Sequence, residues 1–179
     1  MTAIISKHGE LLYSIQGNQE TIELNKSLGW LAVPDPPRSN MYYKGWWVDL
    51  PKTPSLFHIF DYTTKQWIDP RSLDEIKAQK WAEIKAMRDQ LEFGGFEFDG
   101  NIYDSNQVSQ GRIMGAAGAG IDQTWTLANN TTVELTAQQL KELYAALQAH
   151  IASVHERGRI ARQLIFDAET KEQVESIQL

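Results

Sequence analysis

The sequence contains no cysteine, which excludes disulfide bridges and metal sites built on thiolates. Basic residues are also few: 17 lysines and arginines stand against 23 aspartates and glutamates, for a net charge of −6. They are scattered along the chain, whereas binding to a phosphate backbone requires them to be clustered. We therefore predict no nucleic-acid partner.

Long apolar runs are missing as well. No segment approaches the ~20 apolar residues that a membrane span requires. The N-terminal residues lack the basic start and the continuous apolar core of a signal peptide. We expect a soluble protein that is made in the cytoplasm and does not insert into a membrane.

The sequence offers no recognisable catalytic or metal-binding pattern. His150 and His155 are five residues apart, so on a helix they point in different directions and cannot share a metal ion. The glycine-rich stretch 115–120 ends a predicted helix and lacks the Lys-Ser/Thr that closes a phosphate loop. No two acidic residues stand out as a glycosidase pair. We predict a protein that is not an enzyme and has no cofactor and no metal site.

The composition changes near Pro70. All six prolines and four of the six tryptophans lie in the first 70 residues. Short apolar segments broken by glycine, proline and asparagine predict strands there. These segments are 3–5, 11–15, 21–24, 30–33, 57–60 and 66–68. We predict an α+β protein, with a small aromatic-rich β domain over residues 1–70 and an α+β domain over residues 71–179.

An aromatic run over residues 41–50 is the most unusual part of the N-terminal domain. Neighbouring residues of a strand point to opposite faces, so Trp46 and Trp47 cannot both face one core. Two interpretations stay open: a small β domain that packs its aromatic residues inward, or a surface that binds a protein or a sugar. Tyr42, Trp46 and Trp47 are the candidate interface residues of this domain.

Two β-hairpins are expected in the C-terminal domain. Asp99-Gly100 is a preferred pair for a type I′ turn, and this turn places Phe96, Phe98 and Tyr103 on one face. The second hairpin turns at a pair of asparagines. Its apolar residues share a face only if the loop has an odd number of residues, which favours a three-residue loop over 129–131.

Helices alternate with these hairpins. Ser72 and Glu75 have the spacing of a capping box at the start of one helix. A second helix is expected to begin at Asp104 or Ser105 and to run to about residue 119. Thr170, with a glutamine three residues later, begins a short terminal helix.

Glycines line one side of the second helix, because Gly111, Gly115 and Gly118 follow one another at steps of four and three residues. A face without side chains allows another backbone to approach closely. We predict that this face packs against the long C-terminal helix. A Gly115→Leu substitution is then expected to disrupt packing or assembly.

The long helix over residues 135–168 is the main element of the C-terminal domain. Its apolar and small residues recur with heptad spacing: Leu140, Tyr144, Leu147, Ile151, Val154, Gly158, Ala161, Ile165 and Ala168. Such a ridge serves either as the core of a compact domain or as a contact with another chain or a second copy. A bend at its glycine is possible.

Four residues of this ridge are candidate interface residues: Tyr144, Leu147, Ile151 and Val154. A ridge held over about four heptads suits packing against another helix. The expected homo-oligomer is a trimer.

Several short segments carry a family resemblance. They are 60–71, 84–89, 96–100, 109–110, Trp125, 135–137, 165–168 and Ile177. Together they resemble small bacteriophage and prophage tail proteins, over about residues 55–179. The similar part of those proteins is a C-terminal domain of uncharacterised function, often labelled a tail fibre or tail fibre assembly protein.

The resemblance implies a structural or adaptor protein in the tail of the virion, made in the host cytoplasm and docked to fibre or baseplate proteins. Two alternatives stay open. One is a tail fibre assembly chaperone; the other is recognition of a host-surface glycan or receptor through the tryptophans. The resemblance carries over no catalytic or ligand-binding residue.

Overall fold

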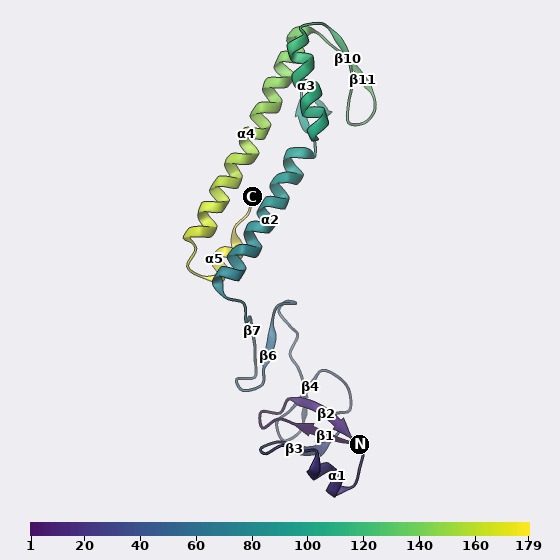
Figure 1. Cartoon of the computed structure of the whole chain (residues 1–179), viewed down its shortest axis with the longest axis vertical. Helices are drawn as coiled ribbons and strands as arrows, with labels where there is room; N and C mark the ends of the chain where they lie inside the picture. Colours follow the sequence, from purple (N-terminus) through teal and green to yellow (C-terminus); the bar gives the residue numbers. More distant parts are fainter. The chain divides into compact units, whose positions relative to one another are not determined.

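The computed structural model describes all 179 residues and divides them into two compact units, Met1–Arg71 and Ser72–Leu179 (Figure 1). Small antiparallel sheets and clustered aromatic residues make up the first unit. Helices and two hairpins make up the second, which includes one long helix near the C-terminus. The predicted α+β fold is therefore confirmed. No helix combines the length and the apolar character that a bilayer crossing requires.

The first unit contains a three-stranded sheet and two separate hairpins. Its elements are β1 (Thr2–Ile5), β2 (Leu11–Ile15), α1 (Gln19–Leu24), β3 (Leu31–Pro34), β4 (Met41–Tyr43), β5 (Trp47–Asp49), β6 (Ile59–Asp61) and β7 (Gln66–Ile68). The sheet has the order β2-β1-β3, with both pairings antiparallel. Pro34 is tolerated because it ends an edge strand, where a missing donor costs no ladder hydrogen bond.

The strand predicted over residues 21–24 is wrong, because this segment belongs to helix α1. Asn18 caps that helix: its side chain accepts a hydrogen bond from the backbone N–H of Thr21, at 2.9 Å. This local cap outweighs the strand preference of Thr21 and Ile22.

The core of the first unit combines the central strand with an aromatic cluster. Ala3, Ile4 and Ile5 are fully buried in β1. Phe60 lies between other rings, with its centroid 5.3 Å from that of Tyr42 and 5.4 Å from that of Trp67. Part of the aromatic content is therefore core, as the first of the two interpretations expects.

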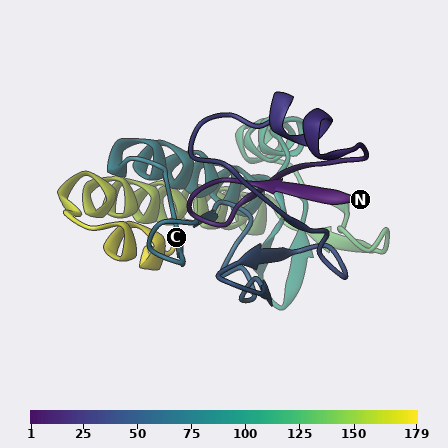
Figure 2. The same cartoon turned by 90° about the horizontal axis from the view of Figure 1, so that it is seen from below.

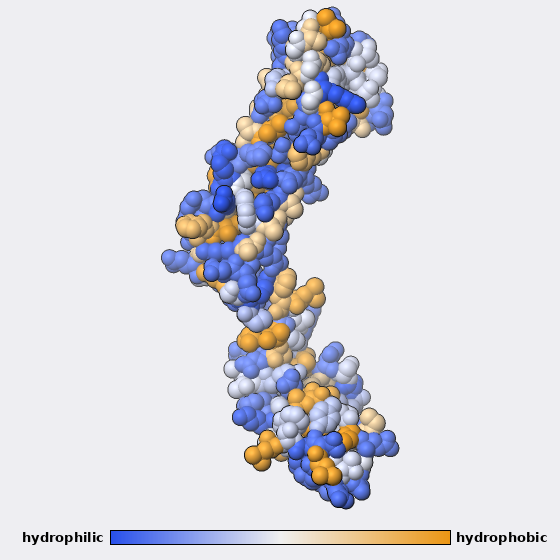
Figure 3. Space-filling view, viewed as in Figure 1, coloured by the Kyte–Doolittle hydropathy of each residue, from blue (hydrophilic) through white to orange (hydrophobic).

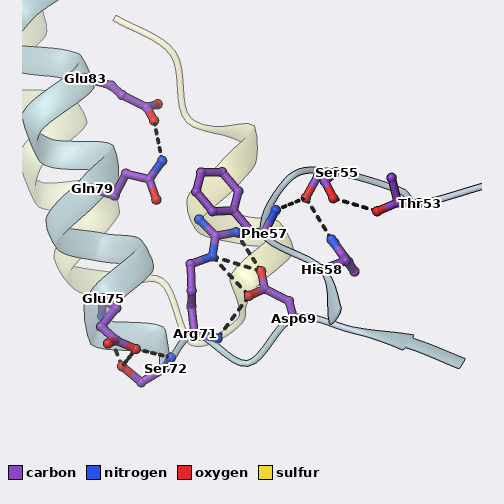
Figure 4. A network of polar contacts seen from close by, with 10 residues as sticks. All are labelled: Thr53, Ser55, Phe57, His58, Asp69, Arg71, Ser72, Glu75, Gln79 and Glu83. Atoms are coloured by element: carbon purple, nitrogen blue, oxygen red, sulfur yellow. Dashed lines mark hydrogen bonds and ion pairs between the residues drawn. The ribbon is translucent and has the colours of Figure 1, made fainter. Parts of the chain in front are cut away.

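The end of the first unit and the start of the second are each fixed by a local polar network (Figure 4). The Arg71 guanidinium donates to the Asp69 carboxylate and lies 3.9 Å from the ring centroid of Phe57. Ser72 and Glu75 then form the predicted capping box of helix α2. The Asp69–Arg71 and Ser72–Glu75 bonds join near neighbours in the chain, whereas the Arg71–Phe57 contact joins two segments of the first unit.

The second unit alternates helices with hairpins. Its elements are α2 (Leu73–Phe93), β8 (Phe96–Phe98), β9 (Asn101–Tyr103), α3 (Gln107–Ala119), β10 (Gln123–Thr126), β11 (Thr132–Leu135), α4 (Ala137–Asp167) and α5 (Lys171–Ser176). The predicted capping box at Thr170 is confirmed, and Thr136 forms another with Gln139 at the start of α4. Helix α4 runs without interruption through Gly158 for 31 residues.

Helix α4 provides the surface on which the other elements of this unit pack. Its first half meets α3 and the hairpins in one core cluster, which includes Leu140, Leu147 and Ile113. Its second half packs, through Ala161 and Ile165, against α2 and against Ile177 and Leu179, which follow α5. In Figure 2 helices α2 and α4 lie side by side, with α5 beside them.

Lysines of α2 attach this helix to the C-terminal end of the unit. Lys77 Nζ donates to the carbonyl oxygen of Phe166 at 2.8 Å, and Lys80 Nζ donates to that of Glu175 at 3.0 Å. These carbonyls belong to the last turns of α4 and α5, where backbone acceptors lack helical partners and where a positive charge is favourable.

Helix α3 begins one or two residues later than predicted. Asn106 is its N-cap, accepting from the backbone N–H groups of Val108 and Ser109. Ser105 is instead fully buried: its hydroxyl donates to Glu92 O at 2.6 Å and accepts from Gly95 N at 2.9 Å. These two bonds close the end of α2, so Ser105 is not available as a helix cap.

Both hairpins have the predicted faces. Asp99 and Gly100 have φ of 48° and 71°, as a type I′ turn requires. The second loop has three residues, as predicted, but it covers residues 128–130, one position earlier. Leu127 N donates to Thr131 O at 2.8 Å, and Asn130 takes the left-handed conformation. The odd loop keeps the apolar residues of both strands on one face.

We predict that Leu147→Ala lowers the free energy of unfolding by about 2–5 kcal/mol, because this side chain is fully buried in the core cluster. Leu164→Ala, on the same helix but 50% exposed, should cost less than about 1 kcal/mol. Urea denaturation followed by helical circular dichroism measures both. Equal losses in the two variants would contradict the assignment of the ridge to the core.

Candidate functional site

The adjacent tryptophans of the first unit have different environments. Trp46 lies in the loop of the β4–β5 hairpin and is 64% exposed, with Lys44 Nζ 5.3 Å from its ring centroid. Trp47 is half-buried: its Nε1 donates to Pro34 O at 2.8 Å and its ring meets Tyr43 edge to face. Tyr42 is buried beside Phe60. Of the three candidates, Trp46 is the one whose side chain is mostly exposed to solvent.

The candidate residues on α4 lie within the unit. Leu147 is fully buried in the core cluster that α4 forms with α3 and the hairpins, and half-buried Tyr144 and Ile151 pack against it. Val154, farther along α4, is also fully buried. The ridge is therefore covered by other elements of its own chain. Whether the protein forms a trimer stays a prediction, but the buried part of this ridge is not available for it.

The predicted contact of the glycine face with α4 is wrong. Gly111, Gly115 and Gly118 are exposed, and a Cβ atom added at any of them would meet nothing within 4 Å. Helix α3 packs on α4 through its opposite face, which carries Ile113 and Ala116. Both faces consist of small or apolar residues, so the sequence did not distinguish them. A longer side chain supplies more apolar area to a core, and Ile113 takes the buried position.

A groove of about 650 Å³ runs between α3 and strand β10. Its lining residues come from three places, the end of β9, helix α3 and the second hairpin: Asp104, Ser109, Arg112, Gly115, Ala116, Gln123, Thr124, Trp125, Thr126, Leu127 and Asn130. It contains one of the glycines predicted at an interface, Gly115. It does not contain the tryptophans of the first unit or the ridge of α4.

Two opposite charges line this groove. The Arg112 guanidinium and the Asp104 carboxylate are both exposed, and neither forms a hydrogen bond or ion pair within the chain. The half-buried indole of Trp125 adds an apolar surface. Sequence reasoning missed Arg112, which belongs to no recognisable motif, and considered Asp104 only as the start of a helix.

A second hollow of about 620 Å³ lies in the first unit, lined by His8, Glu10 and the aromatic residues Phe60, Tyr62 and Trp67 among others. Burial, reinforced by the charge of Glu10, raises the pKa of Tyr62. Hydrogen bonds from the Thr64 hydroxyl and the Thr63 N–H lower the pKa of Asp61, which also lines the hollow. These bonds occupy the Asp61 carboxylate in the turn.

The two histidines of α4 have separate structural partners. His150 Nε2 lies 3.0 Å from Leu91 O, and its ring stacks on Phe96. His155 Nε2 lies 2.9 Å from Glu92 Oε2. They attach α4 to the last turn of α2 at two points. No three histidine, aspartate or glutamate side chains gather where they could hold a metal ion.

We predict that Gly115→Ala raises the free energy of unfolding by about 0.5–1 kcal/mol, because the added methyl group meets nothing and alanine favours the helix. Gly120→Ala should lower it, since this residue ends α3 with φ of 67°. Thermal denaturation of the two variants checks both signs. A loss of stability in Gly115→Ala would instead support the predicted close packing of this glycine against α4.

For the tryptophans, we expect Trp47→Ala to destabilise the first unit by about 1–3 kcal/mol, through lost packing of its half-buried ring against Tyr43 and loss of the hydrogen bond to Pro34 O. Trp46→Ala should change stability by less than about 0.5 kcal/mol because its side chain is exposed. The near-ultraviolet dichroism of the remaining tryptophans, followed during denaturation, measures the effect. Equal destabilisation by both substitutions would contradict the assignment.

Comparison with known proteins assigns most of the second unit to a family. Residues 75–178 match the family model described as a domain of unknown function, DUF4376. Neither a search of curated proteins nor a search of solved structures finds a match. The matched segment covers more than half of the chain and includes most of α2, the groove and the long helix. The chain belongs to the DUF4376 family.

Proposed function

We propose that this protein is a structural adaptor of a phage tail, which docks onto fibre or baseplate proteins through its second unit. The observation that carries the proposal is the outer face of α3. On this face Gly111, Gly115 and Gly118 are exposed, and added Cβ atoms there would meet nothing. Exposed Val108 and Met114 belong to the same helix.

The resemblance of residues 55–179 to small phage tail proteins supplies the setting, and it includes the whole segment matched by the family model. The function of that family is unknown, so the tail assignment rests on the resemblance. A protein located in the virion tail contacts its neighbours in the assembly. The bare outer face of α3 suits such a contact because another backbone could approach it closely.

The orientation of α3 supports docking over a role in the core. Its buried face already packs on α4, through Ile113 and Ala116. The glycines on the other face therefore contribute nothing to packing within the chain, and each weakens the helix by roughly 1 kcal/mol relative to alanine. Three such glycines at steps of four and three residues suit a close contact with another protein chain.

A fibre assembly chaperone is the alternative, because it would use the same exposed surfaces for a shorter time. Glycan binding is a second alternative, because Trp46 is exposed and an indole face can stack on a sugar. The presence of the chain in purified tail particles distinguishes an adaptor from a chaperone that leaves. A loss of glycan binding in Trp46→Ala would favour receptor recognition.

We expect the wild-type chain to co-purify with fibre or baseplate proteins when it is expressed together with them, and to remain in assembled tails. Gly115→Leu should lose at least tenfold in affinity for the partner with little change in melting temperature, because the leucine projects into open space. Affinity chromatography, followed by mass spectrometry of the bound proteins, provides the measurement.

Ala145→Leu is the matched control, since Ala145 is an exposed small residue on α4 and is not part of the α3 face. It should bind the partner as the wild type does. Equal binding by Gly115→Leu and the wild type would remove the α3 face from the contact. Absence of the chain from tails, together with the absence of any tail partner, would overturn the proposed function.

A further inference from the structure

Strand β10 has one unpaired edge. The second hairpin is a two-stranded sheet, so β10 pairs with β11 alone. Leu127 N donates to Thr131 O, which makes this a hydrogen-bonded pair. In an antiparallel ladder such pairs alternate, so Gln123 and Trp125 also direct their backbone groups towards β11. The N–H and C=O groups of Thr124 and Thr126 therefore point away from it, and no hydrogen bond within the chain reaches them.

The groove beside α3 runs along this free edge. Five consecutive residues, Gln123 to Leu127, line it. Alternate side chains of a strand point to opposite faces, so a hollow lined by every residue in turn lies along the strand edge and not on one face. The opposite wall is formed by α3 and Asp104. Backbone donors and acceptors thus face a space of about 650 Å³.

We propose that an extended segment of a partner protein binds in this groove and adds a third strand to the sheet beside β10. An extended backbone presents alternating N–H and C=O groups that match those of Thr124 and Thr126, which a helix cannot do because its own groups are paired. The inference rests on the proposed docking function and specifies how the second unit would hold its partner.

The charges of the groove specify the side chains of that segment. Arg112 has no carboxylate partner in the chain, so an aspartate or glutamate of the bound segment would pair with it. Asp104 also lines the groove, and it favours a donor or basic side chain nearby and disfavours a run of acidic residues. The occupant is therefore an extended segment with one acidic residue, and not a polyanion.

A residue just beyond this edge already bonds to another strand. The N–H of Ala128, in the loop that follows β10, donates to Ile102 O of β9 at 3.1 Å. Beyond this bond the chain reaches Asp104 and then enters α3, while β10 continues along the groove. The incoming strand would continue the pairing that Ile102 begins. Native proteins usually protect or cover such an edge, which also favours an occupant.

The test uses the full chain and a random decapeptide library displayed on phage, selected for binding to the wild type. Enriched peptides should carry one aspartate or glutamate at a fixed position. Bound peptide should slow hydrogen exchange of the Thr124 and Thr126 amides at least tenfold, with little change at Gln123 and Trp125, which already bond to β11. Nuclear magnetic resonance resolves these four amides.

Thr126→Pro removes one outward donor and no ladder hydrogen bond, and proline is tolerated at an edge position of this kind. It should weaken peptide binding at least tenfold with an unchanged helical circular dichroism spectrum. Thr126→Val, which keeps the N–H, is the matched control and should bind as the wild type does. Arg112→Gln should abolish the preference for the acidic residue.

Three results would overturn the inference. The first two are a selection that enriches no peptide, and equal peptide binding by Thr126→Pro and the wild type. The third is a dimer of this chain that Thr126→Pro dissociates, because the segment beside β10 would then come from a second copy. Retained association of Thr126→Pro with tail proteins, where Gly115→Leu loses it, would leave the proposed function standing without strand addition. Peptide binding in the groove without any tail partner would support strand addition and contradict the proposed function.

Discussion

Burial of the apolar ridge of α4 is the constraint on which the second unit depends. An isolated helix is marginal in water, and most of its stability in a protein comes from packing its apolar face. Leu140 and Leu147 are covered by α3 and the hairpins, and Ala161 and Ile165 by α2 and the residues that follow α5. The 31 residues of α4 thus join two core clusters that would otherwise have no common support.

This use of the ridge determines which surfaces remain for a partner. A seam with heptad spacing can join two chains, but here the chain supplies its own covering helices. The elements that cover α4 then turn their other sides to solvent. For α3 that side is nearly bare backbone at Gly111 and Gly115, and for β10 it is an unpaired strand edge. Both surfaces follow from the way the core is filled.

The first unit uses its aromatic residues in two ways. Tyr42 and Phe60 pack inward, and Trp47 is held by a hydrogen bond to the carbonyl of Pro34. Trp46 follows directly in sequence from the glycine of the β4–β5 turn and stays exposed in the loop. The two open interpretations of the aromatic run are thus not exclusive, because neighbouring residues supply core and surface.

Local patterns in the sequence determined the helices of the second unit, their capping boxes and the Asp99-Gly100 turn, because each depends on residues within a few positions of one another. The tertiary structure decided which face of α3 meets α4. Both faces are built from small or apolar residues, and only the free energy of packing on α4 distinguishes them. It also decided that Arg112 lines the same groove as the edge of β10, because contacts between distant segments leave no local pattern.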